Sequence, residues 1–438
     1  MRKALTLSLA LTAALPLAAQ AAAQKERPVL PLSGANFRPM PLAVAQALYA
    51  GPSASRPAGS EIDDALVQDL SVCGLFEVLD RKSFLADASE GVLPSEIKFA
   101  RWQDVGAEGL IKFVVSGSDP VTLEFHLYSA VMAREDLKKR YTAPAAEARS
   151  LAHKFADDVF QFYAHEPGAF QTRIAFVRKS KGSKQLFVSD WDGRNPRQLT
   201  STSMNLLPAW TPDGARLAFT SYSSGAPDLE VLDLRSLKAG VLFHRGASLV
   251  TGAAFSADGK RLAFAMSEED GSSHLWAADS SGQNPRRLTE GFSINSSPSW
   301  SPDGKQLAFV SNRSGSPQIF LIPSSGGAPK RLTFQGNYNQ TPDWSPRGDL
   351  IAFTARDERN VFDLFTVEPA SGKIGRLTQD QGNNEEPTFS PNGRLIAFTS
   401  ARTGRSQLFV MSADGNAQRQ MTRADEVFTP AWGPFAAP

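Results

Sequence analysis

A repeat of about 45 residues constrains this chain more than any other feature of its sequence. Each copy is anchored on a motif, Pro-x-aromatic-Ser/Thr-Pro-Asp-Gly, which is complete at 208–214 and 298–304 and altered at 252–259, 342–348 and 387–393. Successive motif glycines are separated by 45, 45, 44 and 45 residues, at positions Gly214, Gly259, Gly304, Gly348 and Gly393. A period this regular indicates stacked copies of one structural unit.

Each unit contains four short apolar runs separated by turn residues. A Leu/Ile-Ala-Phe run recurs in phase with the motif, and an Arg-Leu-Thr run recurs at 287–289, 331–333 and 376–378. Pro, Asp and Gly set tight turns, and the units lack the 3.6-residue period of helical solenoids. Four strands per unit predict the blades of a β-propeller. We expect aromatic side chains to pack between neighbouring blades, at Trp210, Phe255, Trp300, Trp344 and Phe389.

The ends of the repeat array predict the number of blades. Residues 173–177 resemble the second strand of a blade that has no first strand before it. Residues 428–432 resemble a first strand that has no further strands after it. We therefore expect the C-terminal strand to complete the first blade, which closes the ring and removes the exposed sheet edge. The sequence predicts a six-bladed propeller over residues 173–438.

The N-terminus predicts export. Arg2 and Lys3 precede an apolar stretch over 4–19, and small residues then offer two A-x-A cleavage sites. This pattern is typical of a secretory signal peptide over residues 1–23, with the mature chain starting between Ala22 and Lys25. A membrane anchor is the alternative, but the apolar stretch is short for a span. We expect an exported protein. A net charge of +1 leaves no footprint for nucleic acid or for a membrane surface.

Residues 24–165 do not repeat and predict a small α/β domain, followed by a linker over 166–172. Strands are expected from Pro41 to Leu48, over 76–79, over 109–115 and over 121–132. One helix is expected after an N-cap at Ser60, with Cys73 on its buried face, and another over 145–163. Because Cys73 is the single cysteine, we expect a buried thiol and no internal disulfide. The expected fold class is multidomain: the small α/β domain followed by the all-β propeller.

Motifs for chemistry are lacking. The sequence has no G-x-S-x-G, H-E-x-x-H or Walker motif, and its five histidines lack metal-ligand spacing. We expect no catalytic residue, no metal and no cofactor. The residues that lead into the innermost strands are mostly amides, hydroxyls and apolar groups, with Glu385 and Glu386 as the acidic exceptions. They predict a hydrogen-bonding funnel for a peptide or protein loop, although they are also compatible with ordinary polar strand ends.

The pattern as a whole resembles the TolB family of the Tol-Pal envelope system. The junction Gly168-Ala169-Phe170-Gln171-Thr172-Arg173-Ile174-Ala175-Phe176-Val177 and the Pro-x-Trp-Ser-Pro-Asp-Gly repeats carry the resemblance. Leu79-Asp80-Arg81, Gly326-Gly327-Ala328-Pro329 and the segment 430–435 also fit. The resemblance covers nearly the full chain. It implies a non-enzymatic, monomeric adaptor in the periplasm of a Gram-negative bacterium, which supports outer-membrane integrity and envelope constriction at cell division.

The resemblance also implies two protein partners. It places the peptidoglycan-associated lipoprotein Pal at one mouth of the propeller, on Leu249, Gly252, Asn295, Ser296, Asn339, Gln340, Thr341, Glu385 and Glu386. It places the inner-membrane protein TolA on the mature N-terminal arm, on Glu26, Arg27, Val29 and Leu30. That arm departs from the short, acidic, β-branched stretch of the family, because it contains Pro28, Pro31 and two basic residues.

Two other functions fit a propeller of this kind. An exported hydrolase or peptidase would need a further domain with a nucleophile elbow, and this chain has six residues after Trp432. Measurable hydrolysis lost on substitution of Glu385 or Glu386 would favour it. A sugar- or ligand-binding propeller would need aromatic residues clustered at the channel mouth, where Tyr338 and Phe428 are the candidates.

Overall fold

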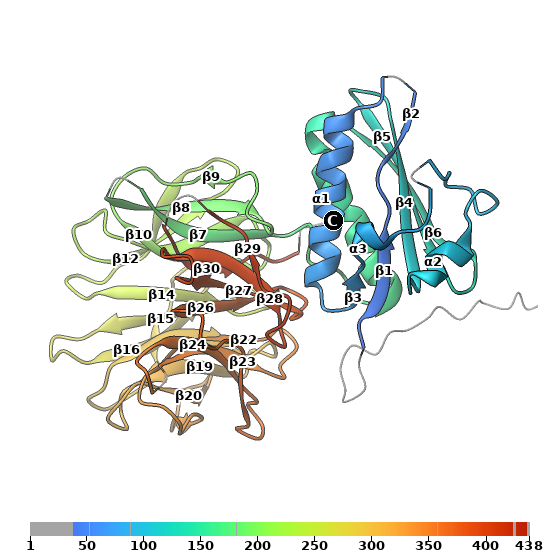
Figure 1. The fold of residues 1–438 in the computed structure, drawn as a ribbon. Helices are drawn as coiled ribbons and strands as arrows, with labels where there is room; N and C mark the ends of the chain where they lie inside the picture. Colours follow the sequence, from blue (N-terminus) through green and yellow to red (C-terminus); the bar gives the residue numbers. More distant parts are fainter. Residues whose placement is uncertain are drawn as a thin grey trace, which may run out of the picture.

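The structure, a computed structural model, describes residues 38–435 apart from positions 52, 88, 181, 357, 424 and 425. The predicted signal peptide 1–23 and the arm residues Glu26, Arg27, Val29 and Leu30 lie outside the described residues. Figure 1 shows an α/β domain beside a ring of sheets, and the ring comprises six four-stranded sheets. The predicted fold class is confirmed.

The N-terminal domain is one mixed sheet with its helices. In chain order it contains β1 (Met40–Val44), β2 (Leu48–Ala50), α1 (Arg56–Val72), β3 (Phe76–Val78), η1 (Arg81–Ser83), α2 (Phe99–Asp104), β4 (Gly109–Ser116), β5 (Val121–Ser129), β6 (Arg134–Ala143), η2 (Ala145–Glu147) and α3 (Ala148–Ala164). The sheet order is β3-β1-β4-β5-β6, with β2 also paired to β4. The pairs β3-β1, β1-β4 and β2-β4 are parallel, and the remaining pairs are antiparallel.

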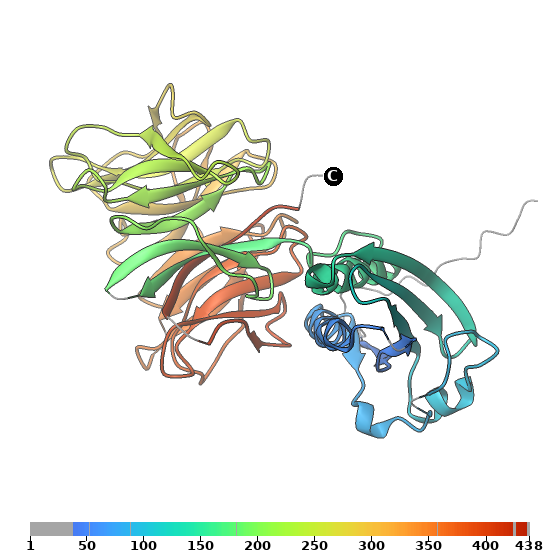
Figure 2. The ribbon, with the colours of Figure 1, turned by 90° about the horizontal axis from the view of Figure 1, so that it is seen from above.

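Helices α1 and α3 lie side by side between the sheet and the propeller (Figures 1 and 2). The predicted buried face of α1 is confirmed, because Ile62, Ala65 and Leu66 are fully buried. The predicted N-cap at Ser60 is wrong. The cap is Ser55, whose Oγ accepts a hydrogen bond from the Ala58 N–H at 3.3 Å. Proline lacks an N–H and has a helical φ, so Pro57 suits the first turn and lets the helix begin earlier.

The predicted strand from Pro41 to Leu48 is in fact two strands, β1 and β2, separated by residues 45–47. Strand β6 was not predicted. Its ten residues alternate between half-buried and exposed, and seven of them are charged or polar, so it carries no apolar run. It is the edge strand of the sheet beyond β5, and charged edge strands resist pairing with other chains. The buried Cys73 ends α1 as its C-cap, which confirms the expected buried thiol.

Five blades are continuous in sequence. The second blade contains β10 (Asn205–Trp210), β11 (Arg216–Ser221), β12 (Asp228–Asp233) and β13 (Ala239–Phe243), and the third contains β14 (Val250–Phe255), β15 (Arg261–Ser267), β16 (Ser273–Asp279) and β17 (Arg286–Arg287). The fourth contains β18 (Asn295–Trp300), β19 (Gln306–Ser311), β20 (Gln318–Pro323) and β21 (Lys330–Arg331). The fifth contains β22 (Asn339–Trp344), β23 (Ile351–Arg356), β24 (Phe362–Val367) and β25 (Ile374–Arg376), and the sixth contains β26 (Asn384–Phe389), β27 (Leu395–Ser400), β28 (Gln407–Ser412) and β29 (Arg419–Gln420).

The first blade joins the two ends of the propeller sequence. It contains β7 (Arg173–Ser180), β8 (Ser183–Asp190) and β9 (Arg197–Gln198), with β30 (Glu426–Trp432) added as the innermost strand. Strand β30 pairs antiparallel with β7, opposing Val427 to Arg178 and Trp432 to Ile174. The predicted closure by the C-terminal strand is confirmed.

Neighbouring blades pack through apolar faces, as the repeat predicted. The Leu/Ile-Ala-Phe strands are buried on both faces, which explains their continuous apolar runs. The motif aromatics also bond across blades. The indole N–H of Trp210 donates to the Ala431 carbonyl of β30 at 2.9 Å, and that of Trp300 donates to the Ala254 carbonyl of β14 at 3.0 Å. These two indoles therefore both fill and orient their blade contacts, whereas the indole N–H of Trp344 is buried without a hydrogen-bond partner.

Candidate partner-binding channel

The six innermost strands, β30, β10, β14, β18, β22 and β26, surround the propeller axis, and each contains the same β-bulge. The pairing register shifts within every one of them. At each bulge one residue has a φ between 44° and 69°, and these residues are Leu207, Gly252, Ser297, Thr341, Glu386 and Thr429. A left-handed conformation costs a non-glycine residue roughly 1–2 kcal/mol. Five such residues in one ring indicate a geometry that the fold maintains against strain, and bulges of this kind concentrate near functional sites.

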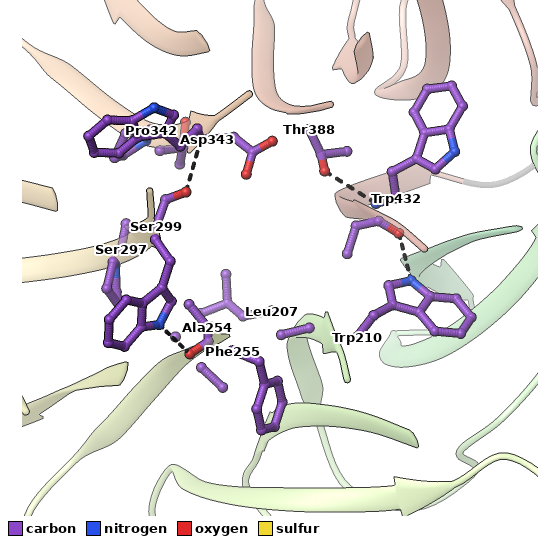
Figure 3. A pocket seen from close by; sticks show the side chains of 18 of the residues that line it. Leu207, Trp210, Ala254, Phe255, Ser297, Ser299, Pro342, Asp343, Thr388 and Trp432 are labelled. Carbon is purple, nitrogen blue, oxygen red and sulfur yellow. Dashed lines mark hydrogen bonds between the residues drawn. The ribbon is translucent and has the colours of Figure 1, made fainter. Parts of the chain in front are cut away.

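A cavity of about 500 Å³ lies on the axis, between this ring and the Pro-Asp-Gly turns (Figure 3). Its wall is largely apolar and includes the four tryptophans Trp210, Trp300, Trp344 and Trp432. Asp343 and Glu386 are the two ionisable side chains among the described residues that line it. A mostly apolar cavity with a few polar groups is the usual form of a binding site in a protein.

Asp343 belongs to a series of side chains that join consecutive blades. Each accepts a hydrogen bond from the backbone N–H of the motif aromatic in the next blade, and all three occupy the x position of the motif. The acceptors are Ser299 Oγ for Trp344 at 2.9 Å, Asp343 Oδ2 for Phe389 at 2.7 Å and Thr388 Oγ1 for Trp432 at 3.2 Å. The x position therefore joins four of the six blades, from blade four through blades five and six to blade one.

Both channel carboxyls titrate near neutral pH. Burial raises the pKa of Asp343 to about 7, although the Phe389 N–H and Ser299 oppose this rise. Burial likewise raises the pKa of Glu386 to about 7, although its Oε2 accepts the Thr429 N–H at 2.5 Å and the Thr399 hydroxyl at 3.3 Å. Burial also raises the pKa of Glu385. The negative charge of the channel therefore depends strongly on pH near neutrality.

The structure brings four of the predicted mouth residues together. Gly252, Ser296, Thr341 and Glu386 line the axial cavity. Leu249 precedes β14 and is exposed, at the mouth where the inner strands begin. Gln340 and Glu385 are half-buried and lie one residue before Thr341 and Glu386 on the same strands.

Asn295 and Asn339 do not face the channel, contrary to the prediction. Both are buried. The Asn339 amide donates to Gln318 Oε1 of the preceding blade at 2.9 Å, and Asn205 and Asn384 donate in the same way to Gln185 Oε1 and Asp363 Oδ1, both at 3.1 Å. The Asn295 amide donates to the Ser273 carbonyl, again in the preceding blade, at 2.6 Å. The N–H groups of these amides therefore connect neighbouring blades instead of facing the axial channel, whereas Asn339 Oδ1 is buried without a hydrogen-bond partner.

The Arg-Leu-Thr run belongs to the same network. The hydroxyl of Thr333 accepts the Ile319 N–H at 2.9 Å and donates to Gln318 Oε1 at 2.9 Å. Thr378 repeats this with Leu364 and Asp363. Sequence reasoning noticed both the asparagine and the threonine but did not connect them. The asparagine and the threonine recur at constant positions within the repeat, and this regularity was the available sequence signal for the network.

The linker between the domains is held by two turns of the propeller. Glu166 accepts from Arg347 Nη1 at 2.9 Å and from Arg394 Nε at 2.6 Å, and Asn392 Nδ2 donates to the Pro167 carbonyl at 3.0 Å. Arg347 and Asn392 stand where other copies of the motif have aspartate. The two motif copies that lack the aspartate are thus the ones that contact the linker, a link that the sequence alone did not reveal.

A buried ionic cluster forms a second contact between the domains. Asp69 of α1 and Asp192 of the turn after β8 flank His153 of α3, with Asp69 Oδ2 at 2.7 Å from His153 Nδ1. Arg149 contacts Asp192 at 2.5 Å. Burial opposes a charge on the imidazole, but the two carboxylates raise the pKa of His153 to about 10. His153 is therefore cationic at neutral pH. Against the effect of burial, His153 and Arg149 lower the pKa of Asp192 to about 2, whereas burial raises the pKa of Asp69.

The apolar core continues across the same boundary. Phe170 of the linker lies between Phe160 of α3 and Trp191 of the first blade, with ring centroids 6.4 and 5.3 Å apart. Burial of aromatic side chains contributes about 1.5–3 kcal/mol each. In the described part of the chain there is no group of three or more potential metal ligands, and no helix is long and apolar enough to cross a membrane.

Comparison with known proteins agrees with this architecture. The sequence model of the TolB amino-terminal domain matches residues 29–135, and that of the TolB beta propeller domain matches residues 160–436. The Tol-Pal system protein TolB of Anaeromyxobacter sp. (strain K) is 47% identical over 441 residues, covering 99% of both chains. That of Myxococcus xanthus (strain DK1622) is 49% identical over 226 residues, 51% of each chain. The crystal structure of TolB from Acinetobacter baumannii superposes with a TM-score of 0.77 at 26% identity, covering 91% of this chain and 97% of that one.

The fold and channel define a class of protein, a closed six-bladed propeller docked through a linker and an ionic cluster onto a small α/β domain. The sequence models of both TolB domains match the chain, and the identity to a TolB protein extends over its full length. The chain belongs to the TolB family of Tol-Pal system proteins.

Proposed function

We propose that the chain is a non-enzymatic adaptor of the Tol-Pal system that acts in the periplasm after removal of residues 1–23. Its propeller mouth binds the peptidoglycan-associated lipoprotein Pal, and its N-terminal arm binds TolA. The two contacts connect outer membrane, peptidoglycan and inner membrane, which supports outer-membrane integrity and constriction during division. Membership of the TolB family supports this proposal.

One observation carries the binding role of the mouth. Large apolar side chains are exposed in the loops that lead into three consecutive inner strands: Leu249 (49% exposed) before β14, Phe292 (80%) and Ile294 (54%) before β18, and Phe334 (70%) before β22. In the described residues, these loops make no hydrogen bond or ion pair to the N-terminal domain. Exposed apolar side chains gathered on one surface mark a site of protein contact.

The contact residues follow from this surface. Leu249, Phe292, Ile294 and Phe334 form the apolar rim of the mouth. Gly252, Ser296, Thr341 and Glu386 line the cavity within the ring, beside Gln340 and Glu385, and offer hydrogen bonds to an inserted segment. Asn295 and Asn339 position these strands from behind.

The TolA contact is proposed on the resemblance alone. Glu26, Arg27, Val29 and Leu30 are the candidate residues of the arm. Extended peptides often add to the edge of a sheet in a partner, and prolines limit how long such an added strand can be. We therefore propose a short contact through these four residues.

Co-purification from native envelopes tests both surfaces. The full-length tagged chain is compared with a double variant, Phe292→Asp with Ile294→Asp, and with a mature chain truncated before Pro31. We expect the double variant to lose Pal by at least ten-fold and to keep TolA, because charges replace the exposed apolar rim. We expect the truncated chain to keep Pal and to lose TolA.

Val241→Asp is the matched control for the rim variant. Val241 is also an exposed apolar residue but lies on β13, in the outermost strand of the second blade. This control should keep both partners. Recovery of no peptidoglycan-binding lipoprotein by the folded wild-type chain would reject the proposed function, and equal recovery by the double variant would reject the rim as the binding surface.

A further inference from the structure

Two blades contain an arginine that folds back onto its own sheet near the mouth. In the fourth blade Arg313 Nη2 donates to Asn295 Oδ1 at 3.1 Å, and its guanidinium lies over Phe309 and Phe320, 5.9 and 5.6 Å from the ring centroids. In the sixth blade Arg402 Nη2 donates to Asn384 Oδ1 at 2.9 Å and lies over Phe398 and Phe409 at 5.6 and 4.5 Å. A planar cation over aromatic rings with an amide acceptor at its edge is a favourable arrangement.

The fifth blade has the same receptor without the arginine. Phe353 and Phe365 form the equivalent ring pair, with centroids 5.8 Å apart. Asn339 holds the equivalent asparagine position, and its Oδ1 is buried without a hydrogen-bond partner. In the sequence, the position that corresponds to Arg313 and Arg402 is occupied by aspartate, at residue 357. A buried acceptor left unpaired is costly and requires an explanation.

A cavity of about 490 Å³ lies at this place, lined by Asn339, Phe353 and Phe365 together with Ile374 and loop residues of the mouth. Glu358 lines it with an exposed carboxylate. Two arginines also line it. Arg376 is paired with Asp363 and lies over Phe365, 5.4 Å from the ring centroid, and Arg356 lies over Tyr338.

In the fourth blade the equivalent Arg331 lies over Phe334 and leaves Phe309 and Phe320 to Arg313. In the fifth blade Arg376 covers Phe365, so Phe353 and Asn339 Oδ1 are the counterparts of Phe309 and Asn295 Oδ1 that a further guanidinium can use.

We propose that this cavity, the fifth-blade pocket, binds an arginine side chain of the protein that docks on the mouth. The guanidinium donates to Asn339 Oδ1 and packs against Phe353, as Arg313 and Arg402 pack against Phe309 and Phe398 within their own blades. The pocket and its preference for a guanidinium are inferred from Arg313 and Arg402 alone, which are its counterparts within the same chain. The assignment of the arginine to the mouth partner rests on the proposed function, because the loop 335–337 and Glu358 that line the pocket belong to the same mouth.

The pocket is tested on the full-length protein with N-acetyl-L-arginine amide as the probe and N-acetyl-L-citrulline amide as its neutral, isosteric control. The δ1 methyl of Ile374, which lines the pocket, is labelled with ¹³C and observed by NMR. We expect a saturable shift of this methyl with the arginine probe, at about millimolar affinity as suits so small a ligand, and none with citrulline. No shift, or equal shifts with both probes, would overturn the pocket.

Asp357→Arg introduces the arginine that the fourth and sixth blades have at the corresponding position of the sequence, and its side chain should occupy the pocket. We expect this variant to fold, with an unchanged or higher melting temperature, and to lose the arginine-induced shift. Ser223→Arg places an arginine at the equivalent position of the second blade, where Ser223 is exposed, and should keep the shift. Persistence of the shift in Asp357→Arg would also overturn the proposal.

The affinity of both variants for the purified lipoprotein tests the source of the arginine. At least ten-fold weaker binding by Asp357→Arg, with unchanged binding by Ser223→Arg, supports a partner arginine in the pocket. Unchanged binding by Asp357→Arg would reject that assignment. If the wild-type protein binds no lipoprotein, the proposed function fails, whereas the probe experiment still decides whether the pocket exists.

Discussion

Asp343 has two roles that make opposite demands on its charge. Its Oδ2 accepts the Phe389 N–H and so connects the fifth and sixth blades, which favours the ionised form. Its position on the wall of the apolar channel removes water from it, which favours the neutral form and dominates the pKa of about 7. The sequence could not predict this balance, because Asp343 occupies the variable x position of the motif and only the closed ring buries it.

The stability of the propeller should depend on the protonation of Asp343. An unfolded aspartate titrates near 3.9, so the folded state binds this proton more tightly between about pH 4 and 7. The contribution of this carboxyl to the free energy of unfolding therefore falls as the pH rises through that window. We expect Asp343→Asn to be more stable than the wild type by about 1–2 kcal/mol at pH 8 and nearly equal at pH 4. Urea unfolding at both pH values measures this.

Asp349→Asn is the control for this experiment, because Asp349 lies six residues further along and its side chain is 55% exposed. It should show no gain that depends on pH between 4 and 8. An Asp343→Asn variant that is less stable than the wild type at pH 8 would show that the charge on the Phe389 hydrogen bond outweighs the burial cost.

At the scale of elements, small departures from the repeat have a physical meaning. The Pro-Asp-Gly turns keep an aspartate where it caps the turn, as Asp303 does by accepting from Ser301 and Lys305. Arg347 gives up that cap and contacts the linker instead. Asn392 keeps the cap, because its Oδ1 accepts from the Ser390 hydroxyl and the Arg394 N–H, and its Nδ2 also donates to the Pro167 carbonyl of the linker. The missing arginine of the fifth blade is a departure of the same kind. A regular repeat therefore predicts the blades, while its irregular positions indicate where the blades meet something else.

Restoring the repeat at the linker should loosen the domains. Arg347→Asp removes one of the two arginines of Glu166 and places a carboxylate beside it, so we expect a loss of about 1 kcal/mol in domain docking. Limited proteolysis within residues 166–172 should become roughly three- to five-fold faster, since 1.4 kcal/mol corresponds to a factor of ten.

Lys305→Asp makes the same charge reversal in the turn of the fourth blade, where the side chain is 82% exposed. Its linker should be cleaved at the wild-type rate. Equal acceleration in both variants would assign the effect to net charge rather than to the Glu166 contact.

For the whole molecule, the sequence predicted the propeller well and its function only through resemblance. The period, the turn residues and the two half-blades at the ends were enough to predict six blades and their closure. The bulge ring was not predicted, because four of its left-handed residues, Leu207, Ser297, Thr341 and Thr429, give no sign of a positive φ. The prediction placed Asn295 and Asn339 on the channel for a related reason. Successive side chains of a strand point to opposite faces, so an error of one residue exchanges the channel side for the blade interior.

Removal of β30 should abolish the closed ring. A chain that ends at Arg423 lacks the innermost strand of the first blade and the hydrogen bond from the Trp432 indole to Thr172 Oγ1 at 2.7 Å. It leaves β7 unpaired on one side and exposes the apolar faces between blades one and two. We expect the melting temperature to fall by well over 10 °C, or cooperative unfolding to be lost, as measured by calorimetry. A chain that ends at Phe435 should melt like the wild type, and a truncated chain that does so too would contradict closure by β30.

The pairing of β30 with β7 also sets the timing of folding in the cell. These partners are about 250 residues apart, and a ribosome adds roughly 5–20 residues per second, so β7 waits of the order of 10–50 s for its partner to be made. Until then the first blade cannot form and the ring cannot close. If the chain is exported through a pore that passes only unfolded polypeptide, this delay keeps the propeller open and able to pass through the pore until synthesis is complete. The last strand then closes the ring once the whole chain has arrived.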